Sequence, residues 1–347
     1  MRRFPYILVV LILGLLLTAC QAEEPGEIPG KGLAAEISQE TATPTVDQDS
    51  QESLIEPLTN STPTITPTLV EDAAQALDSL DLDCEETFCS WPWPGWIERP
   101  FGLGKIRTID ISYPYASTGD GAFDIHHGVE FLNPNGTPVR AALDGEVVFA
   151  DYDATPDIGP HWGFYGYVVI VRHPDLTVEE QVVYTLYGHL SEISVALGDR
   201  VSTGDVLGEV GFSGAAIGPH LHFEVRVGTN DYFHTVNPVL WFAPLDDPEH
   251  PATAMLAGQI LGPSGFPVTE LTMELELLTE HGTVQTIYYP KTYYDGRVNA
   301  HPLLGENFAL SDLPAGNYRL AFVYIQLHEI FFTLEPGALG FISIHLD

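Results

Sequence analysis

A short apolar run that carries alternate histidines constrains this chain most. Residues 218–226 read Gly-Pro-His-Leu-His-Phe-Glu-Val-Arg. In a strand, residues two apart share a face, so His220 and His222 project together while the intervening apolar side chains enter a core. The run therefore predicts a strand that presents two imidazoles side by side.

Further metal-ligating side chains lie upstream. Residues 124–131 read Asp-Ile-His-His-Gly-Val-Glu-Phe, so His126 and Glu130 share a strand face and Gly128 leaves room between them. A lone His189 follows a Tyr-Gly pair. Each histidine alone is more often a surface residue or a hydrogen-bonded core residue. Two histidines and a carboxylate with a water are, however, a common catalytic zinc set, so the combination favours a metal site.

The order of four motifs resembles that of the lysostaphin/LytM-type zinc endopeptidases, which cut peptidoglycan peptides. The motifs are His126-x-Gly-x-Glu130, the stretch at 136–148, Tyr-Gly-His189-Leu and Gly-Pro-His220-Leu-His222-Phe-Glu. The resemblance covers about residues 105–245. One position departs from the family pattern, because the first motif is normally His-x-x-x-Asp and this chain has Glu130.

The resemblance implies roles for five side chains. His126, Glu130 and His222 are expected to hold Zn, which activates a water for attack on a peptide carbonyl. His189 and His220 match the two non-ligand histidines, which accept the proton and stabilise the oxyanion. The expected substrates are peptide bonds of peptidoglycan stem peptides or cross-links. The alternative is a non-catalytic relative that binds wall peptides and activates another cell-wall hydrolase.

The charge balance limits the partners of the chain. Its formal net charge is −35, with 13 basic and 48 acidic residues. Such an excess argues against nucleic acid as a partner and against non-specific adhesion to polyanionic wall polymers or anionic lipid heads. The plainer interpretation is that acidity keeps an exported protein soluble.

The N-terminus reads as an export signal. Residues 1–19 combine two arginines with an apolar run too short to span a bilayer comfortably, and they end in Leu-Thr-Ala before Cys20. This ending resembles the lipobox of bacterial lipoproteins and implies a lipid on Cys20 that anchors the chain to the membrane. An ordinary signal peptide or an uncleaved anchor is the alternative. Either way, the rest of the chain is expected outside the cytoplasm.

Two segments precede the first domain. Residues 20–75 are rich in Thr, Pro, Ser and Glu and predict a disordered tether. Residues 76–104 predict a short helix, a cysteine loop and a Trp/Pro segment. Cys84 and Cys89 predict a small disulfide loop, with a two-thiolate metal site as the rival. The tryptophans of residues 91–96 indicate either an aromatic platform for sugars or a linker packed on the next domain.

Two all-β domains are expected to follow. Residues 105–247, the zinc peptidase domain, contain short strands between glycine-rich turns, at 108–113, 145–150, 167–172, 180–187 and 206–210. They predict an antiparallel β sandwich or barrel, and the family resemblance specifies the duplicated hybrid motif. The loop at 151–166 is expected to wall a groove. Residues 252–347 resemble an immunoglobulin-like β sandwich. Because the predicted site residues all precede 223, we expect this second domain to be dispensable for chemistry.

Overall fold

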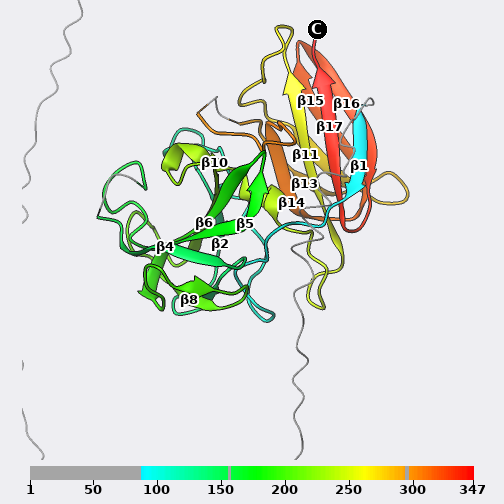
Figure 1. The fold of residues 1–347 in the computed structure, drawn as a ribbon. Coiled ribbons are helices and arrows are strands. Elements are labelled where there is room, and N and C mark those ends of the chain that lie inside the picture. The colour runs from blue at the N-terminus through cyan, green and yellow to red at the C-terminus, as the bar shows by residue number, and fades with distance from the viewer. Residues whose placement is uncertain (1–86, 155–157, 294–296) are drawn as a thin grey trace, which may run out of the picture. The chain divides into compact units, whose positions relative to one another are not determined.

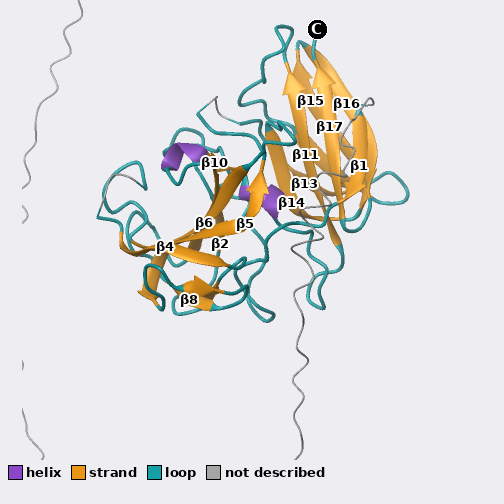
Figure 2. Cartoon of the chain, viewed as in Figure 1, coloured by secondary structure: helices purple, strands orange, loops and turns teal. Residues whose placement is uncertain are grey.

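A computed structural model describes residues 87–347 except 155–157 and 294–296 (Figure 1). It confirms the all-β prediction. In the described residues the helices are two short 3₁₀ turns, at Tyr232–His234 and Pro238–Trp241 (Figure 2). No helix in this part of the chain has the length and apolar character that a membrane crossing requires. The predictions for the signal peptide with Cys20, the tether, the short helix and Cys84 lie outside the described residues.

The first domain is built on one sheet in the order β10-β9-β6-β5-β4-β7, to which β2, β3 and β8 add. β2 pairs with β9, and β8 pairs with both β3 and β6. The pairings in this sheet are antiparallel, as predicted. The strands are β2 (Val129–Phe131), β3 (Pro138–Arg140), β4 (Gly145–Tyr152), β5 (Tyr167–Val178), β6 (Gln181–Ile193), β7 (Arg200–Val201), β8 (Val206–Val210), β9 (Leu221–Val227) and β10 (Thr235–Val236).

Strand β9 is buried on both faces. Its alternate apolar side chains enter the main core, as the sequence pattern predicts. Its other face carries His222, Glu224 and Arg226, and all three are also buried. Because buried charged groups are costly unless they are paired, this polar face must find its partners inside the protein.

The C-terminal domain is a sandwich of two four-stranded sheets, β1-β17-β11-β14 and β13-β12-β15-β16. Side chains from both sheets form one core, so the two-layer architecture is confirmed. A relation to immunoglobulin-like domains stays a prediction. The strands are β1 (Phe88–Pro92), β11 (Thr253–Leu261), β12 (Glu274–Leu278), β13 (Val284–Tyr288), β14 (Phe308–Pro314), β15 (Gly316–Tyr324), β16 (Gln326–Leu334) and β17 (Ala338–His345).

Strand β11 joins the cores of the two domains. Ala254 and Leu256 lie in the core of the sandwich. Met255 and Ala257, on the opposite face, lie in the main core together with strands of the first domain. Covering on both faces explains why β11 reads as a nearly continuous apolar run rather than as an alternating one.

The Trp/Pro segment packs against both domains. Its first part is β1, which pairs with β17 at the edge of the sandwich. Trp93 and Trp96 are buried, and Trp93 Nε1 donates to the Leu240 carbonyl at 3.0 Å. Gly95 has a φ of +65°, and a Cβ there would lie 2.2 Å from the Ala243 nitrogen, so this turn requires glycine. The packing interpretation is confirmed, because these two rings are covered and cannot serve as a sugar platform.

The strand predicted at 108–113 is wrong. The segment is a loop. The Ile109 amide donates to the Asp312 carboxylate at 3.0 Å, and the Asp110 amide donates to the Glu130 carbonyl at 2.9 Å. The alternation of apolar and polar residues resembles a strand, but successive amides bond to different elements and no ladder forms.

Candidate active site

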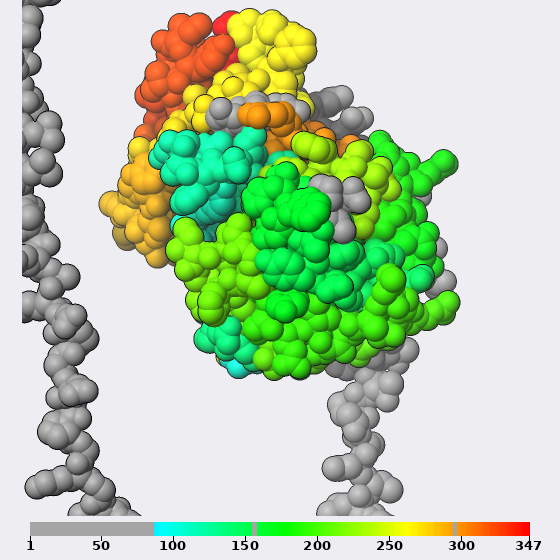
Figure 3. Space-filling view, turned by 90° about the vertical axis from the view of Figure 1, so that its left-hand side faces the viewer, coloured from blue at the N-terminus to red at the C-terminus, as the bar shows by residue number. Residues whose placement is uncertain are grey.

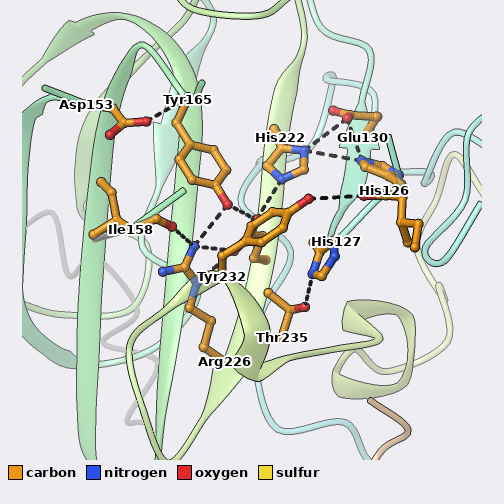
Figure 4. A network of polar contacts seen from close by, with 12 residues as sticks. His126, His127, Glu130, Asp153, Ile158, Tyr165, His222, Arg226, Tyr232 and Thr235 are labelled. Carbon is orange, nitrogen blue, oxygen red and sulfur yellow. Dashed lines mark hydrogen bonds and ion pairs between the residues drawn. The ribbon is translucent and has the colours of Figure 1, made fainter. Parts of the chain in front are cut away.

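The three predicted ligands meet where β2 pairs with β9. Glu130 lies directly opposite His222 in this pairing, and His126 precedes Glu130 by four residues. His126 Nε2 is 2.9 Å from Glu130 Oε1 and 3.3 Å from His222 Nδ1. His222 Nδ1 is 3.1 Å from Glu130 Oε1. Two nitrogens and one oxygen thus form a small triangle (Figure 4).

The triangle fits a zinc ion. Ligands at about 2.0–2.1 Å from a tetrahedral zinc lie roughly 3.3 Å from one another. The edges in the structure, 2.9, 3.1 and 3.3 Å, are close to that separation. Glu130 Oε2 is buried without a hydrogen-bond partner in the described residues, although His220 Nε2 lies 3.2 Å away. The donor types, their spacing and the orphaned oxygen all suit a cation.

Gly128 makes room for the triangle. A Cβ at this position would lie 2.6 Å from both His222 Cε1 and the Phe223 carbonyl oxygen. Neither atom is the movable end of a long side chain. A side chain here would therefore displace the imidazole of His222. This confirms the expectation that the glycine leaves space between the ligands.

A buried carboxylate orients His222. His222 Nε2 is 3.1 Å from Glu224 Oε1, so a hydrogen on Nε2 leaves Nδ1 free to face the triangle. Arg226 Nε donates to Glu224 Oε2 at 2.8 Å, and the Tyr165 hydroxyl donates to Glu224 Oε1. Arg226 also donates to the Tyr165 hydroxyl and to the Ile158 carbonyl (Figure 4). These contacts satisfy the polar face of β9.

The charges in this network depend on one another. Burial opposes ionisation of Glu224, but Arg226 and His222 outweigh it and hold the pKa of Glu224 at about 2. Burial likewise opposes protonation of His222, but Glu130 and Glu224 raise its pKa to about 9. For Glu130, His222 and His126 overcome burial and keep the pKa well below its usual range. In the metal-free protein a proton on His222 therefore balances carboxylate charge at the position that a cation would occupy.

The two predicted non-ligand histidines lie next to the triangle. The rings of His189 and His220 are 4.8 Å apart, and the His189 ring is 5.6 Å from that of His222. His189 Nδ1 donates to the Ser213 carbonyl and His220 Nδ1 to the Gly218 carbonyl, each at 2.8 Å. Burial, with His222 and His220, lowers the pKa of His189 to about 3. His189 is therefore neutral, with Nε2 as a free acceptor.

His189 has a strained backbone. Its φ is +60°, in the left-handed region that side chains other than glycine rarely adopt. The conformation occurs where the pairing of β6 with β5 shifts register between Tyr187 and Leu190, and the His189 amide donates to the Tyr165 carbonyl at 2.8 Å. Strain of this kind is typical of functional sites. It interrupts the alternation of β6 and places His189 beside the ligands.

Three other histidines lie outside the ligand cluster. His127 is buried, stacks on Tyr232 and bonds to Thr235 Oγ1 at 2.8 Å, and burial lowers its pKa to about 4. These contacts give His127 a structural role. His173 is buried and bonds to the Asp144 carbonyl and to Thr185 Oγ1, each at 2.8 Å, and His161 is exposed in the loop after β4.

Four side chains that support the site were not predicted from the sequence. Glu224 and Arg226 continue the alternation of His220 and His222, so the period-two pattern of β9 contained the signal. Tyr165 and Tyr113 carried none, because their contacts with the site are long-range. The Tyr113 ring stacks on His126 with centroids 4.2 Å apart.

Comparisons with known proteins show what this domain is similar to. The model of peptidase family M23 matches residues 124–238. Over 115 residues the chain is 40% identical to DD-carboxypeptidase/endopeptidase Mpg of Neisseria meningitidis, covering 33% of this chain and 22% of that protein. It is 35% identical over 107 residues to peptidoglycan DD-endopeptidase ShyC of Vibrio cholerae, covering 31% and 21%. The match thus spans about a fifth of the length of these relatives.

A solved structure is also similar in part. The catalytic domain of the antimicrobial peptidase lysostaphin from Staphylococcus simulans is 25% identical, with a TM-score of 0.29, and the match covers 48% of this chain and 93% of that one. The family model supports the resemblance to M23 peptidases over residues 124–238, the segment that contains the five predicted site residues.

Proposed function

We propose that this protein is a zinc-dependent endopeptidase that hydrolyses peptide bonds of peptidoglycan stem peptides or cross-links. The observation that carries the proposal is the convergence of His126 Nε2, Glu130 Oε1 and His222 Nδ1 on one point beside two further histidines. The names of the matched relatives, a DD-carboxypeptidase/endopeptidase and a peptidoglycan DD-endopeptidase, support the substrate class.

Each side chain has a defined task in this proposal. His126, Glu130 and His222 would hold the zinc, which supplies Lewis acidity and lowers the pKa of a water to about 7. His189 accepts the proton of the attacking water at Nε2, because its Nδ1 is committed to the Ser213 carbonyl. His220 is likewise committed at Nδ1, so its Nε2 is the nitrogen that faces the developing oxyanion.

The arrangement favours catalysis over the non-catalytic alternative. A module that only binds wall peptides does not need a histidine held in a left-handed conformation beside the ligands. His189 adopts that conformation at φ +60°, at an expected cost on the order of 1 kcal/mol. Retention of such strain is understandable when the imidazole takes part in the reaction.

We also propose that the protein acts outside the cytoplasm, anchored to the membrane by a lipid on Cys20. The support is the sequence Leu-Thr-Ala-Cys after an apolar run. Fractionation of host cells without detergent should place the wild-type protein in the membrane, and Cys20→Ser should release it or leave the precursor unprocessed. Fully soluble wild-type protein would rule the anchor out.

Digestion of purified peptidoglycan tests the activity. The protein lacking residues 1–20 is incubated with sacculi, and the soluble products are analysed by mass spectrometry. Products cut within peptides, with intact glycan strands, are expected for the wild-type protein and for His281→Ala, whose exposed side chain lies in the turn between β12 and β13. Cleavage within the glycan, or equal peptide cleavage by His189→Ala, would contradict the proposal.

A further inference from the structure

His126 is oriented in a different way from His222. His222 Nε2 bonds to a buried carboxylate, whereas His126 Nδ1 is buried with no hydrogen-bond partner in the described residues. Instead, the His126 ring stacks on Tyr113, with planes 10° apart. Its amide donates to the Ser117 carbonyl at 2.9 Å, and its carbonyl accepts from the Ala116 amide at 2.8 Å. The loop at 113–117 therefore fixes the position of this imidazole.

The apolar side chains of this loop pack against the C-terminal domain. Tyr115 is buried in a small cluster with Tyr293 and Val298, and the rings of the two tyrosines meet edge-on at 5.5 Å. Ile125, the residue before His126, packs against the same cluster. Both the loop that bonds to the His126 backbone and the residue before His126 therefore pack against side chains of the C-terminal domain.

Polar contacts also join this loop to the C-terminal domain. The Tyr115 hydroxyl donates to the Thr235 carbonyl at 2.9 Å and accepts from the Asn299 amide at 3.2 Å. Asn299 Nδ2 also donates to the Thr235 carbonyl, and Thr235 begins β10, the neighbour of β9. Lys291 pairs with Asp120 at the surface. In Figure 3 the teal surface of this loop borders orange surface from the segment near residue 300.

We propose that the C-terminal sandwich is a positioning element for the metal ligand His126. Tyr293, Val298 and Asn299 hold the loop, and the loop orients the imidazole. This inference rests on the proposed function only in taking His126 as a ligand. It replaces the expectation, drawn from the sequence, that the second domain is dispensable, because a chain ending near 247 would lose all three contacts.

The physical basis is preorganisation. If a metal-ligating side chain is ordered only when the metal binds, the cost of ordering it lowers the affinity for the metal. Removal of an outer-shell partner of such a side chain typically lowers metal affinity 10–100-fold. His222 carries its own carboxylate partner, so the effect should fall on His126. The C-terminal domain would thereby tune metal affinity without contacting the metal.

Tyr115→Phe tests this in the protein lacking only residues 1–20. The variant removes the hydroxyl that joins Thr235 to Asn299 and keeps the ring. We expect zinc affinity, measured by competition with a chromophoric chelator, to fall roughly tenfold. Hydrogen exchange of the metal-free protein should be faster at the Ala116 and His126 amides. Val298→Ala, which shrinks the apolar cluster, should have the same two effects.

The matched control is Tyr318→Phe. Tyr318 is a buried tyrosine of the same domain whose hydroxyl donates to the Pro314 carbonyl at 2.7 Å, away from this loop. It should lower the free energy of unfolding but leave zinc affinity and exchange at the two amides unchanged. If Val298→Ala fails to fold, zinc affinity and hydrogen exchange are measured on Asn299→Ala instead, because position 299 is exposed.

The proposal is overturned if Tyr115→Phe behaves like Tyr318→Phe in both measurements. The contacts between the loop and the C-terminal domain would then stabilise the fold without positioning His126. The exchange measurement uses neither zinc nor substrate. If the protein proved to have no endopeptidase activity, the result of the exchange measurement would still stand. The two proposals can therefore fail separately.

Discussion

Glu130 and His222 face each other across the β2–β9 pair, with Glu130 Oε1 3.1 Å from His222 Nδ1. The same oxygen lies 2.9 Å from His126 Nε2. The related family normally has aspartate at this position, whose carboxylate is one C–C bond, about 1.5 Å, closer to the backbone. With the longer side chain, Oε1 of Glu130 lies within 3.1 Å of both imidazole nitrogens.

Glu130→Asp should keep zinc but bind it more weakly, because the shorter carboxylate cannot reach the same point without a shift of β2. Glu130→Ala should lose metal and activity together. Zinc content after exhaustive dialysis, with dissociation constants from chelator competition, measures both. Tight, stoichiometric zinc in Glu130→Ala would show that Glu130 is not a ligand and would favour the non-catalytic alternative.

His189→Ala should retain zinc and lose turnover on a cross-linked muropeptide by about 10²–10⁴-fold, the usual contribution of a general base. Equal loss of metal and turnover would mean that His189 supports the cluster rather than the proton transfer. The control is His281→Ala, at an exposed turn between β12 and β13, which should match the wild-type protein in both measurements.

Glu224→Gln should have two separable effects. It leaves Arg226 buried without its counter-charge, which should lower the free energy of unfolding by about 3–5 kcal/mol. It also weakens the partner of His222 Nε2, which should lower zinc affinity roughly 10–100-fold.

The double variant Glu224→Gln/Arg226→Met separates these effects. It removes the unpaired charge, so it should regain much of the stability in urea unfolding while zinc affinity stays low. Recovery of full zinc affinity would indicate that Glu224 acts only through stability.

His301 should make stability sensitive to acid. It is fully buried, its ring stacks on Trp96 at 5.4 Å, and burial lowers its pKa to about 3. Between about pH 3 and the unfolded pKa of about 6.5, the unfolded state binds the extra proton. The free energy of unfolding therefore falls as pH is lowered through this window, and rises as pH increases through it.

His301→Phe keeps an aromatic ring and removes this titration. From pH 7 to pH 5 the wild-type protein should lose about 2 kcal/mol more than the variant in urea unfolding. Other buried histidines titrate in both proteins, so the difference in slope isolates His301. Equal slopes would show that His301 is accessible to protons in the folded state.

The parts of the site that the sequence could predict are the local ones. The alternation in β9 places His220 and His222 on one face whatever the tertiary structure. Glu224 and Arg226 follow from that rule as well, because a charged residue that continues a polar face inside an apolar strand must be paired there. The shared strand face predicted for His126 and Glu130 is wrong, because β2 begins at Val129 and the His126 backbone bonds to Ala116 and Ser117 instead.

The remainder depended on contacts between distant segments. The segment 108–113 has the alternation of a strand, yet its Ile109 amide bonds to Asp312, some two hundred residues later. Likewise, the fixing of His126 involves Tyr113, Tyr115 and Asn299, and no local pattern links these residues. The coupling of the two domains could not be predicted because apolar periodicity shows that a face is buried but not what covers it.

The central claim is tested most directly by adding zinc stepwise to the metal-free protein while cleavage of a cross-linked muropeptide is followed. Zinc-dependent catalysis predicts that the rate rises linearly and reaches a plateau at one equivalent of zinc, with new ends only at peptide bonds. A protein that binds one zinc tightly and cleaves nothing, or one that cleaves equally well in excess chelator, would contradict the claim.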